Sequence, residues 1–374
     1  AKIPSYALDA FSYANAKGNK VLYGAPVALE NVGLVVNTKV AKVPTSFADM
    51  VDQALAFQKK AAGNFGLVIP GGDAYHNYPL FSGLCGYVFG KDAKGNLDAS
   101  DVGVGNAKLL ANAGDVDSWN KSGLLSSKVD YGIGKNAFLA GKAAFWVTGP
   151  WEKDTLDKSG LKVKIVQMPK NKCDSVPFLG VQGFMVTKFA KTHGVESQAR
   201  DLVGSYMLSE GAQTQLSSEN GRAPANTDAA AKIDDALLKQ FAAAGKGGVP
   251  MPNIPEMSSV WGDLGTAWTN VFKGADATSA KTAFRTAGKN IKAKVLALHG
   301  ADDPYVPAKD VAAFEAEMKA GGVDYRLVKY PGAVHSFTHK AAGSDNSKGA
   351  AYNAEADRDS WLQMLRFLEQ AFAR

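Results

Sequence analysis

The sequence predicts an α/β protein. Short apolar runs at residues 143–147, 163–166 and 184–186 alternate with helical patterns such as residues 198–208, and this alternation is typical of α/β folds. The composition, with 46% hydrophobic and 21% charged residues among 374, is that of a globular chain long enough for two or three domains. A second strand and helix pattern begins near residue 294, which indicates a separate C-terminal module.

The first seventy residues contain the clearest local signals. Residues 21–37 are rich in Val and Leu with Gly and Pro interruptions, which predicts strands that cross a hinge region rather than a helix. Residues 46–61 predict a helix that Thr45 or Ser46 caps and that Gly63 and Asn64 end. A short strand at 67–69 follows, and the Ala- and Lys-rich segment 227–248 reads as helical.

The C-terminal module reads as a compact β-α-β-α unit. A buried strand at 295–300 is followed by a turn at 301–307, a helix around Val311, Phe314 and Met318, and a second strand at 325–330. A terminal helix carries Trp361, Leu365, Leu368 and Phe372. We therefore expect two domains, residues 1–290 and residues 291–374.

Composition and spacing argue against several functions. The 42 Lys and Arg residues are scattered among 36 Asp and Glu residues, without the basic stripe that nucleic-acid binding requires. No apolar stretch reaches the roughly 18 residues that span a bilayer. Cys85 and Cys173 are too far apart for a zinc site, and they form either one disulfide or two buried thiols, of which the thiols are favoured. We expect no metal and no cofactor.

Several segments combine aromatic and polar residues in the way that a sugar site needs. Flat rings contact the apolar faces of sugars, and carboxylates accept bonds from their hydroxyls. Tyr75 stands beside Asp73, Trp151 follows an apolar strand at a Gly-Pro turn, and Trp261 follows a Pro-rich segment. Taken singly, each aromatic residue is more often part of a core, and spacing does not place the three in one pocket.

Longer segments carry a family resemblance. They are YGAPVALENVGLVVN (23–37), DAYHNYPL (73–80), DVGVGNA (101–107), TGPW (148–151) and MPNIPEMSSVW (251–261). In this order and at this spacing they resemble the maltose/maltodextrin-binding members of the extracellular solute-binding proteins, over residues 1 to about 290. The resemblance implies a periplasmic-binding-protein-like fold of type II, with two lobes that close on a sugar.

The resemblance also implies a set of site residues. Tyr75, Trp151 and Trp261 match the stacking aromatics. Glu30 matches a carboxylate that accepts sugar hydroxyls, Asp73 stands where the family has Glu, and Met251 lines the site. Gly262 and Gly265 stand where the family pattern has Tyr and Arg, which puts the affinity and the sugar length in question.

The implied partners are maltose or maltodextrin and the membrane subunits of an ABC transporter, in the periplasm or outside the cell. The family begins with a segment that supplies much of the smaller lobe and has no counterpart before residue 1 here. By resemblance, then, the chain is N-terminally truncated. We expect a partial two-lobe fold and impaired sugar binding.

The C-terminal module resembles the end of the dienelactone hydrolase family, an α/β-hydrolase type. HGADDPYVPAKDV (299–311) and YPGAVHSF (330–337) carry that resemblance, and Asp303 and His335 match its catalytic acid and base. The nucleophile should lie on a G-x-S-x-G elbow or its Cys equivalent. The nearest segment is GLCGY around Cys85, which lacks the second Gly.

We therefore expect Asp303 and His335 to be an inactive remnant and the chain not to be an enzyme. Two alternatives remain open at this stage. One is a dienelactone-hydrolase-like carboxylic ester hydrolase. The other is a chimeric chain without a selected function.

Overall fold

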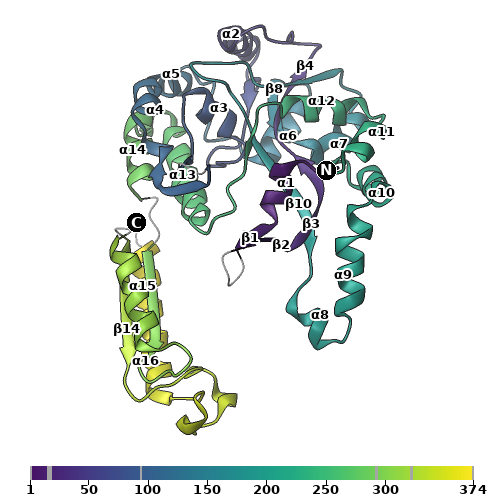
Figure 1. Cartoon of the computed structure of the whole chain (residues 1–374). Coiled ribbons are helices and arrows are strands. Elements are labelled where there is room, and N and C mark those ends of the chain that lie inside the picture. The colour runs from purple at the N-terminus through teal and green to yellow at the C-terminus, as the bar shows by residue number, and fades with distance from the viewer. Residues whose placement is uncertain (1, 15–18, 93–94, 291–293, 321–322, 373–374) are drawn as a thin grey trace. The chain divides into compact units, whose positions relative to one another are not determined.

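The computed structural model of the chain describes residues 2–14, 19–92, 95–290, 294–320 and 323–372 (Figure 1). Its contacts divide the chain into two compact units, Ala1–Asn290 (unit 1) and Ile291–Arg374 (unit 2). Each unit is described by itself. The predicted domain boundary at 290–291 borders on residues 291–293, which lie outside the described part, and the domain assignment stays a prediction.

The first sheet of unit 1 has the order β5-β8-β4-β9. Every residue of β4 and β8 is buried, because Trp146, Phe138 on α6 and Phe241 on α12 pack into one core with Val35 and Ile165. The predicted strands at 143–147 and 163–166 are confirmed. The elements are β4 (Gly33–Asn37), β5 (Phe65–Val68), β8 (Ala143–Thr148), β9 (Val163–Val166), α6 (Tyr131–Leu139) and α12 (Ala236–Ala244).

The second sheet of unit 1 has the order β11-β3-β10-β12. Strand β3 runs antiparallel to β10, with Glu30 opposite Gly180, and the two strands lie side by side in Figure 1. The chain passes from this sheet into β4 at Asn31, whose buried side chain donates to the carbonyl of Phe241 at 2.9 Å. The strands are β3 (Gly24–Glu30), β10 (Phe178–Met185), β11 (Ala223–Pro224) and β12 (Val249–Pro250).

The strands predicted within 21–37 are thus confirmed, and they belong to different sheets. The strand predicted at 184–186 is the end of the longer β10. Two short antiparallel pairs are the remaining strands in the described part of unit 1: β1 (Ser12–Ala14) with β2 (Lys20–Leu22), and β6 (Phe89–Lys91) with β7 (Leu97–Val102).

Two predicted helices differ in detail from the structure. The helix predicted at 46–61 is α2 (Phe47–Gln58), which Ser46 caps by accepting from the amide of Asp49 at 3.0 Å. The helical segment 227–248 is two helices, α11 (Thr227–Lys232) and α12. Asp235 caps α12 through the amides of Leu237 and Leu238, both at 2.9 Å, and such a cap starts a new helix.

The remaining helices of unit 1 surround these sheets. The predicted helix at 198–208 is α9 (Glu196–Gly204) followed by a 3-10 turn, η3 (Tyr206–Leu208). α4, α5, α13 and α14 form one cluster, in which Trp268 and Phe284 pack edge to face. The bounds are α1 (Ser5–Ala10), α3 (Tyr78–Gly83), α4 (Ala107–Asn112), α5 (Gly114–Lys121), α7 (Lys153–Lys158), α8 (Lys188–Thr192), α10 (Glu210–Asn220), α13 (Met257–Val271) and α14 (Ala280–Asn290). Three further 3-10 turns are η1 (Gly103–Gly105), η2 (Pro150–Glu152) and η4 (Gly274–Asp276).

A disulfide joins Cys85 to Cys173. The favoured expectation of two buried thiols is therefore wrong. The Cα atoms lie 5.2 Å apart, within the usual range for a disulfide. The bond connects the end of α3 to the segment before β10, two places that sequence spacing does not bring together.

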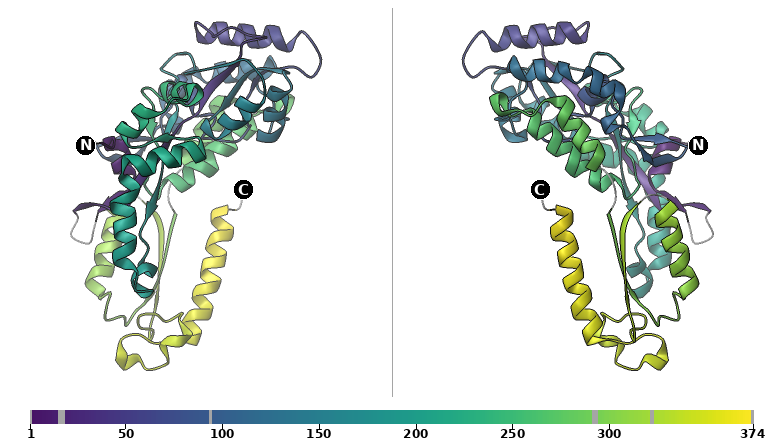
Figure 2. Two further views of the ribbon diagram at one scale, coloured as in Figure 1. Left: turned by 90° about the vertical axis from the view of Figure 1, so that its right-hand side faces the viewer. Right: turned by 90° about the vertical axis from the view of Figure 1, so that its left-hand side faces the viewer.

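Unit 2 has the predicted β-α-β-α order. β13 (Lys294–Gly300) and β14 (Asp324–Tyr330) pair in parallel, and α15 (Ala308–Ala320) and α16 (Ala354–Phe372) lie on opposite sides of them (Figure 2). Two short 3-10 turns, η5 (Lys340–Ala342) and η6 (Asn346–Lys348), precede α16. The α/β fold class is confirmed, and none of the described helices is long and apolar enough to cross a membrane.

We expect the double substitution Cys85→Ser and Cys173→Ser to lower the free energy of unfolding by roughly 2–4 kcal/mol, because the bond restricts the unfolded chain. Urea unfolding followed by tryptophan fluorescence measures this change. A reductant should destabilise the native chain and leave the double variant unaffected. Equal stability of both chains would contradict the role given to the bond.

Candidate functional site

Four aromatic rings of unit 1 form a continuous row. The ring of Tyr75 lies 6.3 Å from that of Trp151 and 6.2 Å from that of Phe178, centroid to centroid. Phe178 in turn lies 5.9 Å from Trp261. Trp261 is 36% exposed, whereas Phe178 is buried beneath its neighbours. The three aromatics singled out from the sequence therefore lie in one row, which Phe178 completes.

A tight turn sets the position of Tyr75. The carboxylate of Asp73 accepts from the backbone amides of Tyr75 at 2.9 Å and His76 at 3.0 Å, and it bonds the His76 ring at 2.8 Å. Such a side-chain turn is typical of Asp. Burial raises the pKa of Asp73, but the bonds from His76 and the backbone outweigh it and leave the pKa below its usual value. The Asp73 carboxylate is thus engaged by its own turn, with 39% of the side chain exposed.

A chain of hydrogen bonds fixes the ring of Trp151, which lies in η2. The indole N–H donates to the Tyr131 hydroxyl at 2.6 Å, and that hydroxyl donates to Glu152 at 2.7 Å. Glu152 is 5% exposed and pairs with Lys135 at 2.7 Å. The indole lies against Gly149, where a Cβ atom would come within 2.3 Å of the ring. Only glycine leaves that space.

A carboxylate and a phenol meet beside this row. Glu30, at the end of β3, accepts from Arg222 Nε at 2.6 Å and from Gln182 Nε2 at 3.1 Å. A Cβ atom on Gly180 would lie 3.0 Å from Glu30 Cγ and 3.4 Å from the Tyr75 hydroxyl. The side chains of Glu30 and Tyr75 therefore both contact the space above Gly180. The Tyr75 hydroxyl is buried and has no hydrogen-bond partner in the described part of the chain.

Burial, and after it the charges of Glu30 and Asp73, raise the pKa of Tyr75. The phenol is therefore neutral at physiological pH and can donate a hydrogen bond. A buried polar group without a partner costs free energy, and such a group at a site with a carboxylate beside it suits a ligand that carries hydroxyls.

Met251 directly follows β12, and its amide donates to the carbonyl of Leu179 at 3.1 Å. This places its backbone beside the start of β10, next to Phe178, and 37% of its surface is exposed. Sequence reasoning missed four residues of the site: Tyr131, Phe178, Gln182 and Arg222. An isolated Arg after Gly221 was the only signal for Arg222, and nothing in its neighbourhood points to Glu30.

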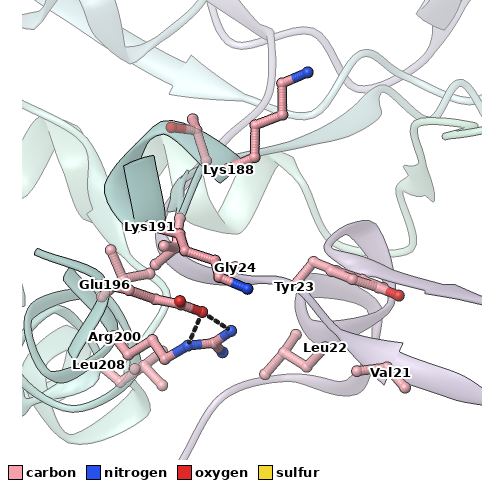
Figure 3. A pocket seen from close by; sticks show the side chains of 13 residues that line it. Val21, Leu22, Tyr23, Gly24, Lys188, Lys191, Glu196, Arg200 and Leu208 are labelled. Atoms are coloured by element: carbon pink, nitrogen blue, oxygen red, sulfur yellow. Dashed lines mark hydrogen bonds and ion pairs between the residues drawn. The ribbon is translucent and has the colours of Figure 1, made fainter. Parts of the chain in front are cut away.

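Neither of two cavities in the described part of unit 1 contains the row of rings. The larger, of 740 Å³, is lined by Val21, Leu22 and Tyr23 on one side and by α8 and α9 on the other (Figure 3). It includes none of the predicted site residues, and its acid, Glu196, is paired with Arg200 at 2.7 Å. The smaller, of 280 Å³, includes Glu30 and Pro150.

Unit 2 contains a hydrogen-bonded Asp–His pair. Asp303 bonds the His335 ring at 2.9 Å and accepts from the amides of Tyr305 and Val306 at 2.8 Å and 3.1 Å. Asp303 is 6% exposed and His335 is 49% exposed. Burial raises the pKa of Asp303, but the bond from His335 and those from the backbone prevail and lower it. Cys85, the nearest sequence candidate for a nucleophile, has no free thiol because it is in the disulfide.

The fold and this row of rings define unit 1 as a binding protein of the periplasmic type, with an α/β fold. Residues 1–246 match the family described as bacterial extracellular solute-binding protein. The chain belongs to that family. Residues 271–372 match the dienelactone hydrolase family.

Individual relatives agree with this assignment. The chain is 30% identical over 294 residues to a galactooligosaccharide-binding protein of Bacillus subtilis, covering 74% of this chain and 67% of that protein. It is 27% identical to the maltodextrin-binding protein MdxE of the same organism, covering 74% and 68%. A solved structure of the Thermus thermophilus maltotriose binding protein bound with maltotriose matches with a TM-score of 0.67 and 28% identity, over 78% of this chain and 75% of that chain. The chain thus spans about two thirds of the length of the two Bacillus relatives.

We expect Tyr131→Phe to destabilise unit 1 by roughly 1–3 kcal/mol, because it leaves the Trp151 N–H and the Glu152 carboxylate without their shared partner. Tyr87→Phe is the matched control, since it removes an exposed bond to Asp101 and should change stability by about 0.5 kcal/mol or less. Thermal unfolding and near-UV circular dichroism of the tryptophans measure both. Equal effects of the two variants would show that the Trp151 network contributes nothing.

Proposed function

We propose that the chain binds linear maltodextrins on unit 1, as the solute-binding component of an ABC sugar importer. The observation that carries this proposal is the ring row Trp151–Tyr75–Phe178–Trp261 beside a carboxylate and an unpartnered phenol. Rings can lie against the apolar faces of pyranoses, while Glu30 and Tyr75 bond their hydroxyls. The names of the galactooligosaccharide-, maltodextrin- and maltotriose-binding relatives support the same class of ligand.

Each of the predicted residues has a role in this proposal. Tyr75, Trp151 and Trp261 supply the stacking surfaces, with Met251 at their margin. Glu30 accepts sugar hydroxyls on an oxygen that Arg222 and Gln182 orient. Asp73 acts chiefly through its turn, by placing Tyr75.

We expect the affinity to be weak. The Asp73 carboxylate is already engaged by its own amides, and Trp261 is followed on α13 by Gly262 and Gly265, which offer no side chain to a ligand. The membrane partner in this proposal is the transporter itself, and the location is the periplasm or the cell exterior. The disulfide supports that location, because such bonds persist in oxidising compartments.

Two substitutions test the hydrogen bond from Tyr75 and the ring contact of Trp151 separately. Tyr75→Phe keeps the ring and removes the unpartnered hydroxyl, so we expect the folded chain to be as stable as before or slightly more stable. Binding of maltotriose, measured by calorimetry, should nevertheless weaken about tenfold, equivalent to about 1.4 kcal/mol. Trp151→Ala should abolish the signal. Trp361→Ala in unit 2 is the control and should bind normally, and unchanged binding in the Tyr75 and Trp151 variants would refute the site.

A second candidate function rests on unit 2. The hydrogen-bonded pair of buried Asp303 and exposed His335 supports a carboxylic ester hydrolase, since a carboxylate that orients an imidazole is the acid and base arrangement of acyl transfer. The sequence lacks a nucleophile elbow, which favours the prediction that Asp303 and His335 are an inactive remnant.

A chromogenic ester assay decides between these readings. If the Asp303–His335 pair is inactive, we expect the native chain and the His335→Ala variant to hydrolyse p-nitrophenyl acetate at equal rates. His193→Ala, which removes an exposed histidine of unit 1, controls for nonspecific reaction with imidazole. A loss of turnover in the His335 variant alone would establish the hydrolase.

A further inference from the structure

The three carboxylates described at the ring row each have a basic partner. Glu30 pairs with Arg222 at 2.6 Å, and Glu152 pairs with Lys135 at 2.7 Å. Arginine and lysine ordinarily stay charged at physiological pH, so each of these two pairs has a fixed counter-charge. The partner of the third carboxylate, Asp73, is a histidine, whose charge depends on whether it holds a second proton.

This histidine, His76, lies inside unit 1 with 7% of its surface exposed. Its Nδ1 atom lies 2.8 Å from Asp73 Oδ2. Its ring meets the rings of Trp151 and Tyr131 edge to face, at centroid distances of 5.7 Å and 5.5 Å. The ring of Tyr75, in the same turn, contacts it in the same manner at 5.9 Å. The imidazole is thus surrounded by three rings of the site and one carboxylate.

The bond to Asp73 determines which imidazole nitrogen carries the proton. Burial raises the pKa of the Asp73 carboxyl, but its bonds to His76 and the backbone together hold the pKa below its usual value, so the group is ionised at neutral pH. A carboxylate only accepts hydrogen bonds, and Nδ1 of His76 is therefore the donor. In the neutral imidazole, Nε2 is then an acceptor, and this buried atom has no hydrogen-bond partner among the described residues.

A second proton on Nε2 would remove this unpaired acceptor. It would also give the Asp73 carboxylate a full counter-charge at hydrogen-bond distance. Aromatic rings within about 6 Å stabilise a cation, and Trp151 and Tyr131 lie within that distance of the imidazole. The surroundings of His76 are therefore suited to its charged form.

A ligand on the ring row changes the surroundings of this pair. The Asp73 side chain is 39% exposed, and its charge acts on the Tyr75 hydroxyl, which the proposed site offers to sugar. A neutral sugar against Tyr75 replaces water beside the carboxylate. Because opposite charges attract more strongly where water is excluded, the ligated site favours the protonated imidazole.

We infer that His76 is the counter-charge of Asp73 in the ligated site, and that sugar binding is accompanied by uptake of a proton on His76. This inference rests on the proposed sugar site and adds to it a positioning residue, which acts on the site through Asp73. Binding and protonation are reciprocal, so a ligand that promotes proton uptake binds more tightly as the pH falls.

The other groups at the site do not compete for this proton. Histidine ordinarily changes its charge between about pH 5 and 8. Burial raises the pKa of both Tyr75 and Tyr131, so these phenols stay neutral over that range. The pairs of Glu30 and Glu152 keep their fixed counter-charges.

Calorimetry of the full chain with maltotriose, in two buffers of different ionisation enthalpy, counts the protons taken up on binding. For the native chain we expect uptake of up to about one proton at about pH 7. We also expect an affinity about fivefold higher at about pH 5.5 than at about pH 8.

Two variants remove the proton uptake without removing the turn. His76→Asn keeps an N–H donor for Asp73 but takes up no proton, so its affinity should not change over this pH range. Asp73→Asn keeps a side chain that forms the same kind of turn and should also bind without proton uptake. His193→Asn, the same substitution at an exposed histidine of unit 1, is the matched control and should behave as the native chain does.

The inference and the proposed sugar site fail in different ways. Maltotriose binding without proton uptake, or with uptake that persists in His76→Asn, would overturn the inference and leave the sugar site intact. A native chain that binds no maltotriose at any pH would overturn both. Near-UV circular dichroism checks the fold of each variant, and if His76→Asn does not fold, the proton count of the native chain against that of Asp73→Asn decides.

Discussion

The antiparallel pairing of β3 with β10 is the interaction on which the site in unit 1 depends. This pairing joins residues that are far apart in the chain. Gln182, for example, donates a hydrogen bond to Glu30, which lies 152 positions before it. The same register puts Gly180 opposite Glu30, and the missing side chain at Gly180 lets the Tyr75 hydroxyl approach the carboxylate. Arg222 then compensates the charge of Glu30 in a place where water is partly excluded.

Hydrogen bonds position two rings of the row in the absence of a ligand. Trp151 is held by its indole N–H, and Tyr75 is held by the turn that Asp73 forms. Phe178, buried at the start of β10, supports both the Tyr75 ring and the Trp261 ring from beneath. Side chains that are already ordered lose little entropy on binding, which favours the proposed contact with a sugar.

Local patterns in the sequence predicted several elements of the fold, and the family resemblance supplied the rest. Neighbours in the chain determine the apolar runs of β8 and β9, the Ser46 cap and the order of strands and helices in unit 2. These features could therefore be predicted from the sequence. The site could be predicted only in part. Resemblance pointed to Tyr75, Trp151 and Trp261, whereas the Arg222–Glu30 pair and Phe178 depend on strand register, which no local signal reveals. Pairing of the cysteines depends on the same long-range geometry.

The bond between Cys85 and Cys173 closes a covalent ring around the segment that contains Tyr131 and Trp151. A protease that cuts the backbone once inside this ring cannot release a fragment, since the two pieces stay attached through sulfur. Exposed loops are where such cuts concentrate. A chain cut once between Cys85 and Cys173 would therefore keep its four aromatic residues in one covalently linked molecule until a reductant breaks the disulfide.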